Sequence, residues 1–401
     1  MRTKSLPRES FLLVLACFFF SGAAGLIYQV AWGKALGLIF GHTVYAIATV
    51  LAVFMAGLAA GSAYIGRWNE QRAESLAVYA WIEFMVAATG ALSLAGLAGV
   101  RSLYVAAYPS VNGLQPLLLA LRFFGTAVVL FIPTFLMGGT LPVLVRGITR
   151  NSAELGMRVS QLYWVNTLGA VAGTLISGFV LLPALGLSVT IASAVVLNIL
   201  AGLIALRIAK ESHNARGVKG SPSIVASTAP EPQQPTFAFL LILFAVVGST
   251  AFSYEIAWTR LLAITISSST YAFTLMLAMF LAGTVIGSAF FQYFFASSGQ
   301  ISFTTFSRTQ TGIGIAALSS LILFHWIPAV IPPLLRATHQ TFNGLVLAQF
   351  VTSALTVLPV AIIFGFNFPM VIVLLDRTAG TKSGRSAALM RQTLLAPSSD
   401  H

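Results

Sequence analysis

The chain has 401 residues, of which 57% are hydrophobic and only 8% are charged, and its mean hydropathy is +0.90. A soluble domain carries about 25% charged residues, so this composition excludes a water-soluble globular protein and predicts a chain whose apolar surface is covered by lipid. The formal net charge of +12 would by itself suggest a nucleic-acid partner, but the positions of the charges exclude one.

Ten apolar stretches of about 20 residues or more predict transmembrane helices. Their approximate limits are 10–32, 43–66, 75–99, 116–145, 160–183, 187–208, 236–258, 270–294, 309–327 and 343–375. With the N-terminus placed inside, 17 of the 22 Lys and Arg residues fall on the inner side and five on the outer side. This asymmetry follows the positive-inside rule. It predicts that both termini are cytoplasmic, and it accounts for the net charge without a nucleic-acid partner.

One segment between the spans is typical of a linker. Residues 210–235 contain four prolines and no apolar periodicity, which predicts an extended or disordered connection. We therefore expect a first six-helix membrane repeat at 1–209, a cytoplasmic linker at 210–235 and a second, four-helix membrane repeat at 236–401. Residues 384–401 begin to resemble the opening of the fifth span. We therefore expect an incomplete second repeat, either as a truncated product or as a natural ten-helix form.

The two halves are related by an internal repeat. The motif YQVAW at 28–32 returns as YEIAW at 254–258, and the offset of 226 residues also joins other equivalent residues. The further pairs are Lys34 with Arg260, Tyr45 with Tyr271, Gly57 with Gly283, Gly61 with Gly287, Pro133 with Pro359, and Gly139 with Gly365. A repeat of this length predicts two helical halves packed around a site near the membrane midplane, as in transporters.

Two kinds of irregular backbone are expected at repeat-related places. The apolar segments 33–42 and 259–269 are too short to cross a bilayer, which favours interfacial or re-entrant segments at the outer face. Clusters of proline and glycine within spans predict interrupted helices, because proline removes a backbone donor. The predicted helix-break residues are Pro133, Gly139, Pro142, Pro359, Gly365 and Pro369. A packing kink without a ligand is the alternative for these clusters.

Two carboxyl groups inside spans are candidate binding residues, because an ionisable group in lipid is costly and is therefore often functional. Glu255 lies near the outer boundary of its span, and its repeat mate is the uncharged Gln29. Glu83 lies in the third span with no basic residue within one helical turn, so it is a candidate carrier of a proton or cation. The alternatives are an ion pair of Glu255 with Arg260, and a neutral Glu83 that is hydrogen-bonded between helices.

Four aromatic residues of the repeated motif complete the candidate binding set. Tyr28 and Trp32 share a helix face, as do Tyr254 and Trp258, because each pair is four residues apart. Aromatic faces attract ammonium groups, so the two pairs could line a cation site, although an interfacial aromatic belt is the favoured interpretation. The five histidines are not at ligand spacing and there is one cysteine. We therefore expect no catalytic residue, metal site or cofactor.

Several stretches resemble one bacterial family. The segments 21–62, 132–146 and 162–186 are similar to signatures of the membrane domain of bacterial fused transporter/spermidine-synthase-like proteins. The resemblance implies a major-facilitator-like bundle in the inner membrane, which in that family is commonly followed by a soluble aminopropyltransferase-like domain. This chain contains no glycine-rich strand-turn-helix motif for such a domain.

The sequence therefore predicts an all-α polytopic membrane protein with a duplicated, major-facilitator-like plan of about ten helices. The leading functional hypothesis is a transporter-like module for polyamines or another small cation. The first alternative is a non-transporting anchor or scaffold for a separately encoded synthase. The second is a spermidine synthase by family name. The expected partners are the lipid bilayer, a small cationic metabolite and a separate synthase-like protein, with no nucleic acid.

Overall fold

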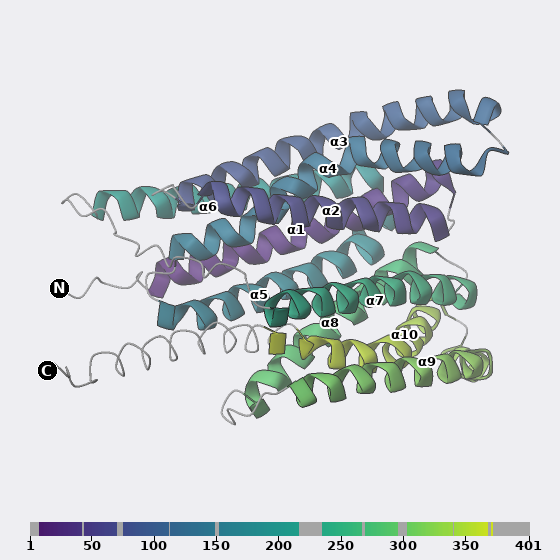
Figure 1. Ribbon diagram of the computed structural model, residues 1–401. Coiled ribbons are helices and arrows are strands. Elements are labelled where there is room, and N and C mark those ends of the chain that lie inside the picture. Colours follow the sequence, from purple (N-terminus) through teal and green to yellow (C-terminus); the bar gives the residue numbers. More distant parts are fainter. Residues whose placement is uncertain are drawn as a thin grey trace, which may run out of the picture. The chain divides into compact units, whose positions relative to one another are not determined.

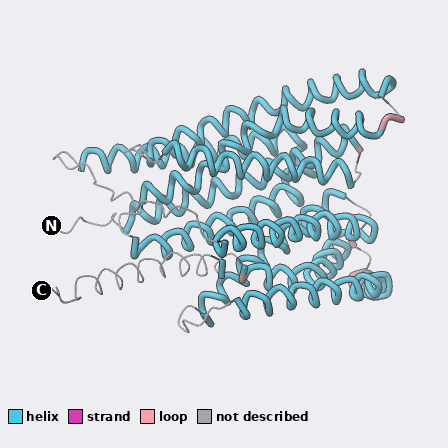
Figure 2. The backbone as a smooth tube through the Cα atoms, in the orientation of Figure 1, coloured by secondary structure: helices cyan, strands magenta, loops and turns pink. Residues whose placement is uncertain are grey.

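The described part of the chain is helical throughout. The computed structural model describes residues 8–41, 44–69, 75–111, 113–148, 152–215, 235–266, 269–295, 303–339, 341–367 and 370–371. The helices in these ranges are α1 (Arg8–Phe40), α2 (Val44–Asn69), α3 (Ser75–Val111), α4 (Gln115–Ile148), α5 (Ser152–Ile176), the π-helical segment η1 (Ser177–Leu181), α6 (Leu182–Ala215), α7 (Pro235–Ile266), α8 (Ser269–Phe295), α9 (Phe303–Ala337) and α10 (Phe342–Gly365) (Figure 1). Figure 2 draws the described ranges almost entirely as helix, with a few short loops.

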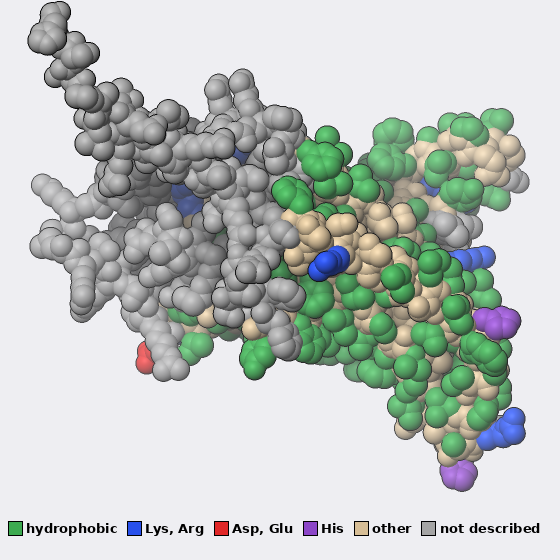
Figure 3. All heavy atoms as spheres, turned by 60° about the horizontal axis from the view of Figure 1, so that its bottom comes forward, with side chains coloured by type: hydrophobic (Ala, Val, Ile, Leu, Met, Phe, Trp, Pro, Cys, Tyr) green, Lys and Arg blue, Asp and Glu red, His purple; other side chains and the backbone are tan. Residues whose placement is uncertain are grey.

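The chain contains long apolar runs. In lipid, the backbone N–H and C=O groups of such a run find hydrogen-bond partners only within the segment itself, so the run forms a helix. In the described ranges, nine helical stretches are long and apolar enough to cross a membrane. Their outward side chains are apolar as well, including Leu92, Val128 and Leu318 at 66–74% exposure. Hydrophobic side chains cover most of the described surface on the face drawn in Figure 3. The chain is therefore an all-α, multi-pass membrane protein.

The nine stretches correspond to ten crossings because one of them, Gln161–Glu211, is 51 residues long. At 1.5 Å per residue such a helix would be about 75 Å long, more than twice the hydrocarbon thickness. The stretch bends at Gly186, whose φ of 75° lies outside the helical region. It is also loosened just before the bend, where η1 is followed by Pro183, a residue that has no backbone donor. The predicted fifth and sixth spans are its two arms.

The first six helices pack into one body. In it α1 lies against α5 and α6, α3 lies against α4 and α6, and α2 packs along α4. Its core contains the fully buried side chains of Tyr28, Trp32, Tyr79, Leu130 and Ile191. The apolar core supplies little drive between helices in lipid, so close approach and interhelical hydrogen bonds decide this packing.

Glycines allow a close helix crossing at repeat-related places on α2 and α8. A Cβ atom added at Gly57 or Gly61 on α2 would collide with Thr134 or Phe135 on α4. Their repeat mates Gly283 and Gly287 on α8 stand in the same relation to residues 361 and 362 of α10. Small residues allow this approach of two backbones. The two crossings lie within one residue of the predicted register, since residue 361 is the counterpart of Phe135.

The chain divides into two compact units. The first comprises Met1–Lys219 with Ile256–Ala282, and the second comprises Gly220–Glu255 with Gly283–His401. In the second unit α9 packs along α10, and Phe291 and Phe306 form a small core with Met370 and Val371. This grouping follows contacts and not the repeats. The division into 1–209, 210–235 and 236–401 therefore stays a prediction, and most of 210–235 and all of 384–401 lie outside the described residues.

The expectation of separate re-entrant segments is wrong. Residues 33–40 continue α1 and residues 259–266 continue α7 without a break. The reason is that both segments are apolar and contain no proline, so propagation of the existing helix costs less than nucleation of a new element, and α1 ends only just before Gly41, whose φ is 82°.

The expected interruption of the fourth helix is also absent. α4 runs through Pro133, Gly139 and Pro142, because membrane helices tolerate proline where neighbouring helices and Thr side chains support the backbone. Here Thr134 donates from Oγ1 to the carbonyl oxygen of Leu130 at 2.7 Å. Pro359 likewise lies within α10, whereas Gly365 is the last residue of that helix. Pro369 lies outside the described residues.

Candidate functional site

A buried carboxyl group lies between α3 and α6 in the six-helix body. Glu83 on α3 is 0% exposed, and its Oε2 accepts a hydrogen bond of 2.6 Å from Nδ2 of Asn198 on α6, itself 2% exposed. Glu83 Oε1 and Asn198 Oδ1 have no hydrogen-bond partner among the described residues. Glu83 is thus hydrogen-bonded between helices, two acceptor atoms of the pair remain unsatisfied, and both interpretations of Glu83 stay predictions.

The groups around Glu83 are polar but not basic. The hydroxyls of Ser21 on α1 and Tyr79 on α3 lie beside the carboxyl, and Cys17 and Tyr28 on α1 are close enough to interact with it electrostatically. The Tyr79 hydroxyl lies close to the carboxyl without regular hydrogen-bond geometry. Within the described ranges no Lys, Arg or His side chain takes part in this cluster. The site can therefore hold a proton or compensate a cation, but it has no charge partner of its own.

The aromatic pair of the first repeat extends this polar cluster along the α1–α3 contact. The rings of Tyr28 and Trp32 stack with centroids 4.9 Å apart. Trp32 donates from Nε1 to Oγ of Ser93 at 2.8 Å, and Ser93 donates to the carbonyl oxygen of Gly90 at 2.6 Å. A side chain at Gly90 would collide with the Tyr28 ring. Tyr28 and Trp32 are 0% exposed, so the interfacial-belt interpretation is wrong for both, since belt residues contact head groups.

Glu255 and Gln29 occupy equivalent positions and are equally buried. Each is 3% exposed, and among the described residues Oε1 of Glu255 and Nε2 of Gln29 make no hydrogen bond. Arg260 is exposed and forms no ion pair with Glu255, because five residues along a helix place the two side chains on different faces. The expected ion-pair anchor is therefore absent. Glu255 remains a buried carboxyl without a basic partner in the described part of the chain.

The aromatic residues of the second repeat are found in ring contacts. Trp258 is 2% exposed and its ring lies 6.4 Å from that of Phe280. The ring of Tyr254 lies 6.1 Å from that of Phe364 in an edge-on contact. Burial of Trp258 excludes a belt position for it as well. That the two aromatic pairs face each other across a pseudo-twofold axis stays a prediction.

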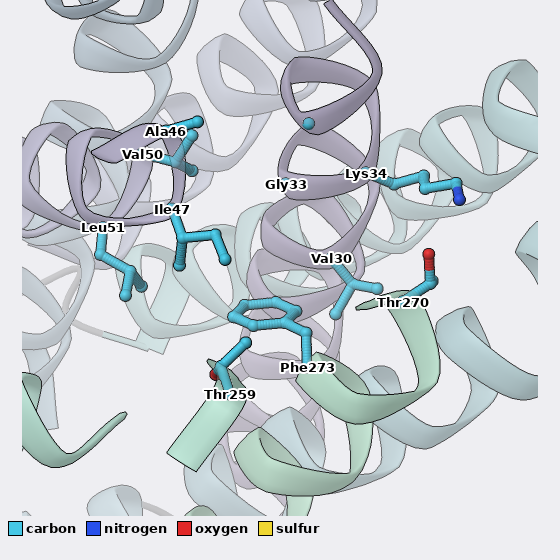
Figure 4. A pocket seen from close by; sticks show the side chains of 11 residues that line it. Val30, Gly33, Lys34, Ala46, Ile47, Val50, Leu51, Thr259, Thr270 and Phe273 are labelled. Carbon is cyan, nitrogen blue, oxygen red and sulfur yellow. The ribbon is translucent and has the colours of Figure 1, made fainter. Parts of the chain in front are cut away.

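A pocket in the first unit was not predicted. It lies between the α1–α2 hairpin and the parts of α7 and α8 that belong to the same unit (Figure 4). Its lining residues are Val30, Gly33, Lys34, Gly37, Ala46, Ile47, Val50, Leu51, Thr259, Thr270 and Phe273. The α1 residues follow one another at spacings of three and four, so they form the helix face that is turned away from the Tyr28–Trp32 contact with α3.

The lining of this pocket includes two pairs of repeat-related residues. Gly33 and Thr259 are repeat mates, as are Ile47 and Phe273, so each half contributes the same two structural positions. A Cβ at Gly33 would lie 3.8 Å from Cε1 of Phe273, which is ordinary van der Waals contact. The stacking of Phe179 from η1 on Tyr271, with centroids 5.2 Å apart, fixes the start of α8 beside the pocket. The sequence did hold a signal for this site, namely the residue that follows each motif tryptophan.

The predicted candidate residues do not line the pocket. Glu83, Gln29, Tyr28 and Trp32 belong to the α1 and α3 core instead, and no acidic side chain is among the lining residues. The pocket walls are mostly apolar, with Lys34 as the one cation among the lining residues and with two threonine hydroxyls. These residues were not predicted because the candidate residues were chosen for their charge or their aromatic rings. Gly33 and Thr259, at repeat-equivalent positions, are uncharged and not aromatic.

Comparisons with known proteins give partial similarity. No protein-family model matches the chain. The polyamine aminopropyltransferases of two Mycobacterium tuberculosis strains, CDC 1551 / Oshkosh and H37Rv, and of Mycobacterium bovis are each 28% identical to it over 183 residues. That match covers 44% of this chain and 31% of each relative, so the chain spans less than a third of their length. A crystal structure of an autoinhibited POT family peptide transporter aligns over 97% of this chain and 92% of its own, with 12% identity and a TM-score of 0.39.

Proposed function

We propose that the chain is a transport-type module of a bacterial cell membrane whose cargo is a small organic cation, with polyamines as the first class to test. The observation that carries the proposal is the presence of two buried carboxyl groups, Glu83 and Glu255, on apolar helices and without a basic partner among the described residues. Each is 0–3% exposed.

The physical argument is one of charge compensation. A charged residue at the centre of a membrane helix costs at least ~2.5 kcal/mol, and such groups mark ion and substrate pathways. An organic cation that leaves water needs a negative group in its path for the same reason. Glu83 supplies one between α3 and α6, where Asn198 donates a hydrogen bond to the carboxyl and the hydroxyls of Ser21 and Tyr79 lie beside it.

The substrate class rests on family context. The three mycobacterial relatives are named for polyamine aminopropyl transfer, and the sequence resembles the membrane domain of spermidine-synthase-like proteins. Aminopropyl transfer itself is not assigned to this chain. The same family context supports a scaffold for a separate synthase, and one experiment separates the two roles.

The test is uptake of labelled spermidine into proteoliposomes that contain the purified chain. We expect saturable uptake by the wild type, and at least a tenfold loss with Glu83→Gln, which keeps the size of the side chain and removes the charge. Glu211→Gln is the matched control, since Glu211 is 59% exposed and pairs with Arg207 on the surface of α6. Absence of uptake by correctly folded wild type would reject transport of polyamines and favour the scaffold.

A further inference from the structure

We propose that the pocket between the α1–α2 hairpin and residues 256–282 binds a phospholipid with an anionic head group. The proposal concerns a site and a ligand charge that differ from those of the proposed transport function. It rests on the polar groups of the pocket, on its apolar walls, and on where each lies along the helices (Figure 4).

The polar groups of the pocket fit an anion. Lys34 lines it, and no acidic residue does. Within the described ranges Lys34 has no ion-pair partner. The hydroxyls of Thr259 and Thr270 are buried without a hydrogen-bond partner among the described residues, and Thr259 is 1% exposed. A buried hydroxyl without a partner is costly, and a phosphodiester oxygen satisfies it while it compensates the charge of Lys34.

The remaining walls fit an acyl chain. Val30, Val50, Leu51 and the Phe273 ring are apolar, and the ring lies close to Gly33. A free inorganic anion would leave this surface in contact with water, which costs free energy in proportion to the apolar area. The combination of a cationic edge and apolar walls selects one molecule with both characters.

Along α1 the charged lining residue lies nearer to the membrane boundary than the apolar one. Lys34 lies six residues before the end of α1 at Phe40, or about 9 Å, and Val30 lies about 15 Å from that end. Since α1 has 33 residues and is about 20 Å longer than the hydrocarbon core, Lys34 falls near the boundary of that core, where a lipid head group lies. Thr270, the second residue of α8, is also close to a helix end.

The same groups disfavour a polyamine in this pocket. A cation there would lie near Lys34, and like charges in a low-dielectric site repel strongly. No carboxylate among the lining residues offsets this repulsion. Neither Glu83 nor Glu255, the carboxyl groups that carry the proposed transport function, is among the lining residues, and either proposal can fail without the other.

The test is photo-crosslinking of the purified full chain in detergent with phosphatidylglycerol that carries a diazirine in its acyl chain. We expect crosslinks to peptides that contain residues 30–51 and 259–273. Unlabelled phosphatidylglycerol should suppress them at lower concentration than phosphatidylcholine. Suppression by phosphatidylcholine at equal concentration would overturn the head-group assignment. Protection by inorganic phosphate would make it a free-anion site, and protection by spermidine would make it a cation site.

Matched variants test the roles of the Lys34 charge and of the space beside Gly33 separately. Lys34→Gln should lower crosslinking by about fivefold, which is what one basic residue contributes to anionic-lipid binding. Arg260→Gln removes the repeat-equivalent charge, which does not line the pocket, and should leave crosslinking unchanged. Gly33→Leu should fill the pocket and abolish crosslinking, whereas Gly33→Ala should retain it, since its Cβ has room. Equal loss with Lys34→Gln and Arg260→Gln would contradict the proposal. If a variant fails to fold, the wild-type competition series still decides.

Discussion

The amide of Asn198 donates to the carboxylate of Glu83 across 2.6 Å, although 115 residues separate them in the chain. This bond joins α3 to α6 inside an apolar body, where a polar side chain has few other partners. A buried polar group left alone costs about 1–3 kcal/mol, while measured hydrogen bonds between membrane helices average only ~0.6 kcal/mol. The loss of one partner should therefore cost more than the loss of both.

The first prediction follows from that inequality. Asn198→Leu should lower the thermal unfolding midpoint in detergent, because it leaves Glu83 with no interhelical donor of regular geometry. The double variant Glu83→Leu with Asn198→Leu should recover much of the loss. A thermal-shift double-mutant cycle measures the coupling between the two positions. A double variant at least as unstable as the sum of the single variants would show that the pair is not coupled.

The second prediction concerns the repeated glycine crossing. Gly61→Ala and Gly287→Ala should each destabilise the protein by about 1–3 kcal/mol, the usual cost of overpacking, because the new methyl group would meet a backbone carbonyl on α4 or α10. Gly99→Ala and Gly314→Ala are controls, since nothing lies within 4 Å of their Cβ positions. These controls should be neutral or slightly stabilising. Unfolding in detergent provides the comparison, and unequal effects at the two repeat mates would argue against equivalent crossings.

Most of the fold could be predicted from hydropathy and from the repeat. Ten spans were expected, and nine long apolar stretches, one of them bent at Gly186, account for them in the described residues. The helix break predicted from the prolines of α4 and the re-entrant segments predicted from two short apolar stretches were wrong. Pro133 and Pro142 lie inside an unbroken α4, because tolerance of proline depends on neighbouring helices that a single sequence does not reveal. For the same reason residues 33–40 could not be recognised as the end of α1.

The candidate site was only partly predictable. Burial cost identified Glu83 and Glu255 from sequence alone, and both are buried. The partner Asn198 could not be found, because an asparagine in a span has no periodic signature and the contact spans 115 residues. The pocket was missed as well. Gly33 and Thr259 are uncharged, and their equivalence gains meaning only when the helices are placed in space.

The third prediction concerns the aromatic contact of α1 with α3. Gly90→Ala should displace the Tyr28 ring, because its Cβ would overlap the phenol group, and Trp32 is stacked on that ring. The tryptophan emission spectrum should shift and the unfolding midpoint should fall. Ser93→Ala removes the acceptor of the Trp32 Nε1 hydrogen bond and the donor to the Gly90 carbonyl oxygen, and it leaves the buried Nε1 without a partner, so it should cost about 1–3 kcal/mol. A folded Gly90→Ala variant with an unchanged spectrum would contradict the packing.

The fourth prediction is the membrane topology. Reporter fusions at Arg216 and after Asp400 should both report a cytoplasmic location, because 17 of the 22 basic residues then lie on the inner side. A fusion at Gly113, between α3 and α4, serves as the control and should report the outer side. If either of the first two fusions reports the outside, at least one of the ten crossings is absent.

The last prediction compares the repeat mates Glu255 and Gln29. Both are 3% exposed with one unpartnered polar atom in the described part of the chain, but only Glu255 can compensate a cation. Glu255→Gln makes this position chemically equal to its mate, so it should abolish spermidine uptake while the unfolding midpoint stays within about 1 kcal/mol of wild type, since an isosteric change preserves packing. Gln29→Ala should reduce uptake less. Proteoliposome uptake and detergent thermal shifts on the same preparations separate the two effects. If Glu255→Gln lowers stability and leaves uptake intact, Glu255 supports the structure of α7 and the cation pathway lies elsewhere.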